Sequence, residues 1–125
     1  MILVDTSIWV NHFRRSSAIL ATLLQENLVH THPFVLGELA CGQLPNRAKL
    51  LKLLADLPML PPPPHSEVFA FIETRSLMGK GLGWTDVNLL ASALLFRAPL
   101  WSADLRLAKV ATSLNIAFHP GGGYN

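Results

Sequence analysis

Short apolar runs alternate with longer segments of helical periodicity along this chain, and no other feature constrains its fold as strongly. Ile2–Val4 is an apolar run with two β-branched residues, typical of a strand buried on both faces of a parallel sheet. Further short strands are expected at 28–29, 57–60, 100–101 and 116–118. In the first half of the chain, helices are expected from Asp5–Ser7 through Phe13, at 17–26, from Pro33 to Cys41 with an end near Gly42, and at 46–56. In the second half, they are expected from Ser66 to Met78, at 87–96 with a cap at Thr85, and at 104–113. This order predicts an α/β fold with a mostly parallel sheet.

The length of 125 residues predicts one domain. We interpret Pro61–Pro64 as a rigid connection inside that domain rather than a boundary, because each half alone would be too small. The expected domain covers 1–120, and the glycines at 121–123 begin a flexible tail over 121–125. Half of the residues are hydrophobic and only 14% are charged, which excludes a disordered chain. No apolar run approaches the ~18 residues of a membrane span.

The cysteine content and the N-terminus favour a cytoplasmic protein. Cys41 is the single cysteine, so no disulfide can form within the chain, and a small buried role is expected for it. No basic leader precedes Ile2–Val4, which argues against a secretory signal.

Four of the eight acids stand in sequence that otherwise belongs to the core: Asp5, Glu38, Asp86 and Asp104. Charged side chains are rarely buried unless they are paired or bind something. Each also has a structural interpretation: Asp5 and Asp104 as helix N-caps, Asp86 as a first-turn acid, and Glu38 as a satisfied core acid. Two of the four follow predicted strands and one opens a helix, so we expect them at one end of a parallel sheet.

Carboxylates brought together repel one another, and a divalent cation is the usual remedy. Oxygen ligands favour Mg²⁺ or Mn²⁺ over zinc. The five histidines, at 12, 30, 32, 65 and 119, show no metal-ligand spacing, and we expect His30 and His32 to be solvated. An acidic metal cluster in a small α/β domain indicates phosphoryl chemistry.

Four motifs carry a resemblance to the PIN-domain ribonucleases, and the chain length matches that family's VapC toxins. They are Val4–Ser7, Glu38–Gly42 as a Glu-Leu-x-x-Gly element, Gly83–Asp86 followed by the small and apolar 89–93, and Trp101–Asp104. Together and in this order they cover essentially the whole chain. One departure is that Leu107 stands where many relatives have an aromatic residue.

The resemblance implies a three-layer α/β/α PIN-like domain that is a Mg²⁺- or Mn²⁺-dependent endoribonuclease, the toxin of a bacterial type II toxin–antitoxin pair. It also implies a tRNA or ribosomal RNA substrate, a cognate antitoxin and a homodimer. The residues that it marks are Asp5, Glu38, Asp86 and Asp104 as metal-holding catalytic acids, with Thr6, Ser7 and Ser102 as supporting hydroxyls.

Basic residues near these motifs are candidate RNA contacts. The candidates are Arg75 and Lys80, which flank the loop leading to Asp86, then Arg14, Arg15, and Arg106 with Lys109. A solvated helix face is the alternative for each. Of the three tryptophans, expected mainly in the core, Trp84 is the candidate for base stacking. The net charge is only +2, but four acids sequestered around metal would leave ten basic side chains facing four acids.

Three rival functions are weaker or remain open. A response-regulator receiver needs an acidic pair after its first strand, where this chain has Asp5 and Thr6. A haloacid-dehalogenase-type phosphatase needs a second Asp at the position of Ser7. A catalytically weak PIN-like module that mainly binds protein partners remains the alternative.

Overall fold

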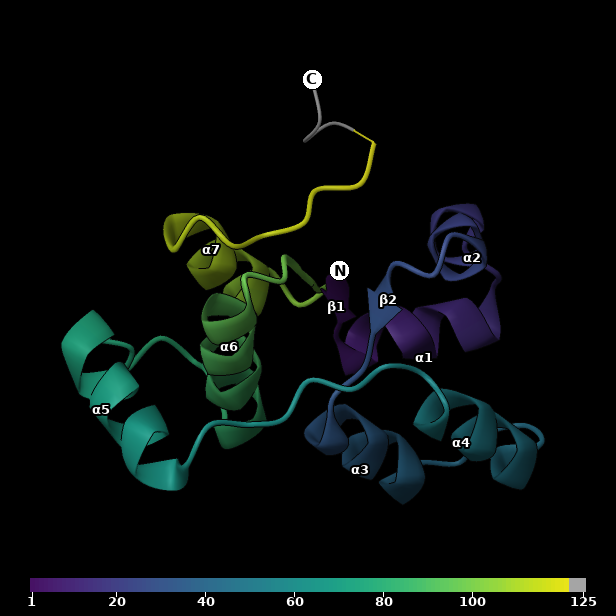
Figure 1. Ribbon diagram of the computed structural model, residues 1–125, viewed down its shortest axis with the longest axis horizontal. Coiled ribbons are helices and arrows are strands. Elements are labelled where there is room, and N and C mark those ends of the chain that lie inside the picture. Colours follow the sequence, from purple (N-terminus) through teal and green to yellow (C-terminus); the bar gives the residue numbers. More distant parts are fainter. Residues whose placement is uncertain (122–125) are drawn as a thin grey trace.

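The structure, a computed structural model, describes residues 1–121, in which seven helices surround a three-stranded sheet (Figure 1). In chain order the elements are β1 (Ile2–Val4), α1 (Thr6–Arg14), α2 (Ala18–Gln25), β2 (Val29–His30), α3 (Pro33–Cys41), α4 (Arg47–Ala55), α5 (His65–Arg75), α6 (Trp84–Phe96), β3 (Leu100–Trp101) and α7 (Leu105–Ser113). Beyond Gly121, the tail expected at 121–125 lies outside the described residues.

The sheet has the order β2-β1-β3 and is parallel throughout, as predicted. Leu3 lies opposite His30 on one side and Leu100 on the other, and it is fully buried. β1 passes into α1 through Asp5, and β3 passes into α7 through the segment that ends at Asp104. Because neighbouring parallel strands end at the same edge, both acids are delivered to one side of the sheet.

The helices form layers beside the strands. In Figure 1, α6 and α7 lie on one side of β1 and β2, and α1 and α2 lie on the other. α6 and α7 pack on β3, and α5 packs on α6. Every residue of α6 from Val87 to Ala93 is buried, which confirms the prediction of an interior helix. None of the helices within 1–121 combines the length and apolar character needed to cross a bilayer.

Two predicted strands are reduced to single bridging residues. Met59 bridges to Thr31 beside β2, and Ala117 bridges to Leu100 beside β3. Prolines at 58 and 61 flank Met59, and proline cannot donate to a ladder, so the pairing there stays short.

Two helix starts and one helix end differ from the predictions. α5 begins at His65, with Pro64 rather than Ser66 at its N-cap, and it ends at Arg75 rather than Met78 because Ser76 adopts the left-handed conformation (φ 54°). α6 begins at Trp84, with Gly83 at its N-cap. Thr85 therefore lies inside the first turn of α6 and is not its cap. The Asp86 carboxylate in the same turn accepts the Gly83 N–H at 2.8 Å.

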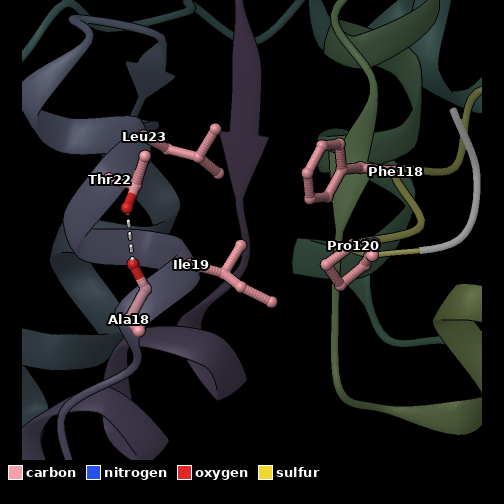
Figure 2. Close-up of a pocket in the computed structure, with 7 residues that line it drawn as sticks. Ala18, Ile19, Thr22, Leu23, Phe118 and Pro120 are labelled. Carbon is pink, nitrogen blue, oxygen red and sulfur yellow. Dashed lines mark hydrogen bonds between the residues drawn. The ribbon is translucent and has the colours of Figure 1, made fainter.

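An apolar hollow of about 280 Å³ lies between α2 and the C-terminal segment (Figure 2). It is lined by Ala18, Ile19, Thr22, Leu23, Phe118, Pro120 and Gly121. None of the four candidate acids lines it. Cys41, expected to be buried, is exposed at the end of α3.

His32 is fully buried, so the expectation of a solvated histidine is wrong. Its Nδ1 accepts the Phe34 N–H at 3.1 Å as the N-cap of α3. The ring proton therefore lies on Nε2, which donates to Ser92 Oγ at 3.1 Å, and Ser92 in turn donates to the Pro61 carbonyl at 2.9 Å. This chain of hydrogen bonds joins α3, α6 and the proline connection, and burial lowers the pKa of His32 to about 4.

The buried His32 makes stability depend on pH. In the unfolded chain the imidazole titrates near its usual pKa of 6.5, whereas in the folded protein it stays neutral down to about pH 4. The unfolded state therefore binds more protons in that window. The His32 contribution to the free energy of unfolding should be fully present above pH 6.5 and fall by roughly 3 kcal/mol as the pH drops toward 4.

Urea unfolding at several pH values between 7 and 4 measures this loss. His32→Asn keeps an N-cap acceptor and should flatten the profile, whereas the exposed control His119→Asn should keep the wild-type slope. An unchanged slope in His32→Asn would contradict the assignment.

Candidate functional site

Asp5 is the buried acid of the site, with 5% of its surface exposed. It occupies the N-cap position of α1, yet its side chain makes no capping hydrogen bond. Instead Oδ2 accepts from Ser7 Oγ at 2.8 Å and from Ser102 Oγ at 2.7 Å. The N-cap interpretation of its carboxylate is therefore wrong, because two hydroxyls turn the side chain toward the end of β3.

The same two serines join the ends of β1 and β3. Ser7 Oγ accepts the backbone N–H of Ala103 at 2.9 Å, and Ser102 Oγ accepts that of Asp104 at 3.0 Å. The two hydroxyl oxygens are 3.4 Å apart. The backbone that carries Asp104 is thus fixed relative to Asp5.

Glu38 and Asp104 are each held through one carboxylate oxygen. Thr6 Oγ1 donates to Glu38 Oε1 at 2.6 Å, which links the first turn of α1 to α3. Asp104 is the N-cap of α7, as its structural interpretation predicted: Oδ1 accepts the N–H of Arg106 at 2.9 Å and of Leu107 at 3.3 Å. Leu107, where relatives have an aromatic residue, is fully buried.

The negative charges of the other three acids act on Asp86. Burial raises the pKa of Asp86, and the negative charges of Asp5, Asp104 and Glu38 raise it further, while the hydrogen bond from Gly83 lowers it. The four acids, far apart in the sequence, therefore lie within electrostatic reach of one position.

The hydrogen bonds leave one oxygen of each acid for a ligand. Among residues 1–121, no donor reaches Asp5 Oδ1, Glu38 Oε2, Asp86 Oδ1 or Asp104 Oδ2, and no Lys or Arg forms an ion pair with these acids. Four unpaired carboxylates suit a hard divalent cation in their donor chemistry. Within the described chain, no three His, Cys, Asp or Glu side chains are arranged as a ready-made metal cage.

The predicted basic contacts occupy three different places. Lys80 lines one cleft together with Arg106 and Lys109, and Arg75, the predicted companion of Lys80, does not line it. Arg14 lines a second cleft of about 260 Å³ with Thr6 and Glu38. Arg15, at the C-cap of α1, and Arg75, at the end of α5, lie on the exposed surface and line neither cleft.

Trp84 differs from the other tryptophans. Trp9 and Trp101 are buried, as expected, whereas Trp84 is 38% exposed. Its ring lies against His65 and Phe69, with ring centroids 5.5 and 5.1 Å apart. One residue, Thr85, separates Trp84 from Asp86 in the sequence.

Two features of the site region were missed from sequence. The structural role of His32 had a signal, since the following Pro33 at the first helical position marks His32 as an N-cap. The cleft that Lys80 and Arg106 share had no signal in the sequence, because the two residues belong to segments that meet only in the folded chain.

Comparisons with known proteins agree with this fold. A family model for the PIN domain matches residues 2–113. Ribonuclease VapC32 of Mycobacterium tuberculosis, from strains CDC 1551 and H37Rv, is 43% identical over 118 residues, which are 94% of this chain and 95% of the relative. The fold is similar to two solved structures. One is VapBC-1 from nontypeable Haemophilus influenzae (TM-score 0.69, 20% identity, 90% of this chain and 94% of that chain). The other is FitAB bound to an IR36 DNA fragment (TM-score 0.61, 17% identity, 94% and 92%).

Ser102→Ala should lower the free energy of unfolding by about 1–3 kcal/mol, because it removes one donor to the buried Asp5 and the acceptor of the Asp104 N–H. Urea denaturation measures the change. Ser113→Ala is the matched control: its exposed hydroxyl bonds only to its own helix, so we expect a change within about 0.5 kcal/mol. Equal losses in the two variants would show that the Ser102 hydroxyl has no special structural role.

Proposed function

The chain belongs to the PIN domain family, and from that premise we propose that it is a divalent-metal-dependent endoribonuclease, the toxin of a toxin–antitoxin pair. The observation that carries the proposal is that the negative charges of Asp5, Glu38 and Asp104 act on Asp86, while within residues 1–121 no basic side chain forms an ion pair with any of the four acids. The 43% identity with a protein named as a ribonuclease supports RNA as the substrate. An RNA substrate also favours the cytoplasm as the place of action.

Asp5, Glu38, Asp86 and Asp104 would hold Mg²⁺ or Mn²⁺ through the oxygens that no protein donor reaches. When bound, such a cation supplies Lewis acidity, which neutralises charge on the phosphate and lowers the pKa of water in the site.

The hydroxyl residues act as positioning residues. Ser7 and Ser102 hold Asp5 Oδ2, so that Oδ1 is presented to the site. Thr6 holds Glu38 Oε1 in the same way. Each hydrogen bond fixes the direction of one carboxylate before substrate arrives, which reduces the reorganisation needed during the reaction.

We assign RNA contacts to the surface around the acids. The partly exposed ring of Trp84 is near Asp86 in the chain and offers a face for base stacking. Arg14 shares a cleft with Glu38 and suits a phosphate. The exposed Arg15 and Arg75 are candidates for more peripheral phosphate contacts.

The nuclease activity is tested with purified protein, an RNA substrate, and Mg²⁺ or Mn²⁺. Asp5→Asn and Asp86→Asn should each reduce cleavage by roughly 10²–10³-fold, since each removes a charge directed at the reacting groups, and a chelator should abolish it. Asp56→Asn is the matched control, because Asp56 is an exposed acid at the C-cap of α4 and its loss should leave cleavage unchanged.

Cleavage that survives a chelator or the acid substitutions would overturn the metal-dependent mechanism. A wild-type chain that cleaves no RNA, yet binds a protein partner, would favour the alternative of a PIN-like module that acts mainly through protein binding.

A homodimer and a cognate antitoxin are the proposed protein partners. Exposed apolar side chains on α5, on α6 and just after α5 supply surface for such contacts: Phe69, Leu95 and Met78. Light scattering at micromolar concentration should give twice the chain mass of 13.7 kDa, and a 13.7 kDa species would contradict the dimer. Toxicity on expression should be relieved by the protein encoded beside this chain if that protein is the antitoxin, and persistent toxicity would contradict that assignment.

A further inference from the structure

A basic cleft of about 310 Å³ lies where the loop before α6 meets α7. Its lining residues are Lys80, Arg106, Lys109, Val110 and Ser113. The two elements touch at Gly81, because a Cβ placed there would come within 2.7 Å of Arg106 Cδ. Gly81 also has a φ of +75°, a conformation that favours glycine. The loop conformation thus places the stem of Arg106 along one wall of the cleft.

The cleft carries positive charge that the protein does not compensate. No acidic side chain lines it. Within the described part of the chain, none of Lys80, Arg106 and Lys109 forms an ion pair. Three cations gathered in one cleft attract a polyanion such as a nucleic-acid backbone.

Each of the two segments that form the cleft donates a backbone hydrogen bond to a candidate catalytic acid. The loop that carries Lys80 ends at Gly83, whose N–H donates to Asp86 Oδ2 at 2.8 Å. The backbone N–H of Arg106 donates to Asp104 Oδ1 at 2.9 Å. An anion in this cleft would therefore be held by the same two segments whose backbone N–H groups hold Asp86 and Asp104.

We propose that the Lys80–Arg106–Lys109 cleft is a subsite for the RNA backbone, which holds a phosphate of the strand other than the one that is cut. This subsite rests on the proposed function. Its lining offers two ammonium groups, a guanidinium and a hydroxyl but no aromatic ring, so it positions the strand without reading bases.

The test measures binding of a labelled single-stranded RNA to the full chain carrying Asp86→Asn, which prevents cleavage, over a series of salt concentrations. Adding Lys80→Ala and Lys109→Ala leaves the Gly81–Arg106 contact in place and removes two phosphate contacts. The slope of log Kd against log salt should decrease by about 1.4, and Kd should rise about tenfold near 0.15 M salt. This loss should be similar for RNAs of different sequence.

The matched control is Lys49→Ala with Lys52→Ala, which removes the same charge from exposed positions on α4. α4 lies far from α7 in Figure 1, and we expect a change in Kd below about twofold. In the cleaving protein, the cleft substitutions should raise KM far more than they lower kcat.

The outcomes separate the subsite from the nuclease function. If the wild-type chain cleaves RNA but the cleft variant matches the α4 control in Kd and salt slope, the subsite is overturned and the nuclease function stands. If the cleft variant keeps its RNA affinity but loses binding to the antitoxin, the cleft belongs to an acidic protein partner and the proposal is again overturned. If the wild-type chain neither binds nor cleaves RNA, the proposed function fails and the subsite fails with it.

Discussion

Repulsion among four carboxylates is the constraint on which this structure depends. Asp5, Glu38 and Asp104 all raise the pKa of Asp86, and within residues 1–121 no basic side chain pairs with any of them. Asp5 is buried and Asp86 half-buried, whereas Glu38 and Asp104 are exposed. Charge is therefore costly at the first two positions unless hydrogen-bond donors hold the carboxylates. Here hydroxyls hold Asp5 and Glu38, and backbone N–H groups hold Asp86 and Asp104. The fold therefore tolerates a concentration of negative charge that a bound cation would relieve.

The donors that hold the acids also hold the fold together. Ser7 and Ser102 bond to Asp5 and to the backbone of the β3–α7 connection. The Asp86 carboxylate accepts the N–H of Gly83, the N-cap residue of α6, through one oxygen and leaves the other without a protein donor. Away from the acids, the buried His32 connects α3 and α6, the two helices that carry Glu38 and Asp86. The same hydrogen bonds thus hold both the site and the surrounding fold, so a substitution that removes one of them alters both.

Charge is separated by location in this protein. The acids of the site converge at one edge of a small parallel sheet, whereas the basic side chains of the Lys80–Arg106–Lys109 cleft lie on the two segments that lead to Asp86 and Asp104. A net charge of only +2 conceals this separation. A polyanion in that cleft would contact the two segments that also hold Asp86 and Asp104.

The sequence by itself determined the alternation of strands and helices and the interior helix α6, because apolar periodicity is a local property. It also singled out the four candidate acids, since each stands among apolar residues in the sequence. It predicted the parallel sheet correctly and misplaced the ends of α5 and the start of α6, where caps compete over one or two residues. Only the tertiary structure decided that the Asp5 side chain turns from α1 toward Ser102, that His32 is buried, and that Lys80 lines a cleft with Arg106 and not with Arg75. Each of these features depends on contacts between residues that lie far apart in the sequence. Local sequence patterns do not determine such contacts.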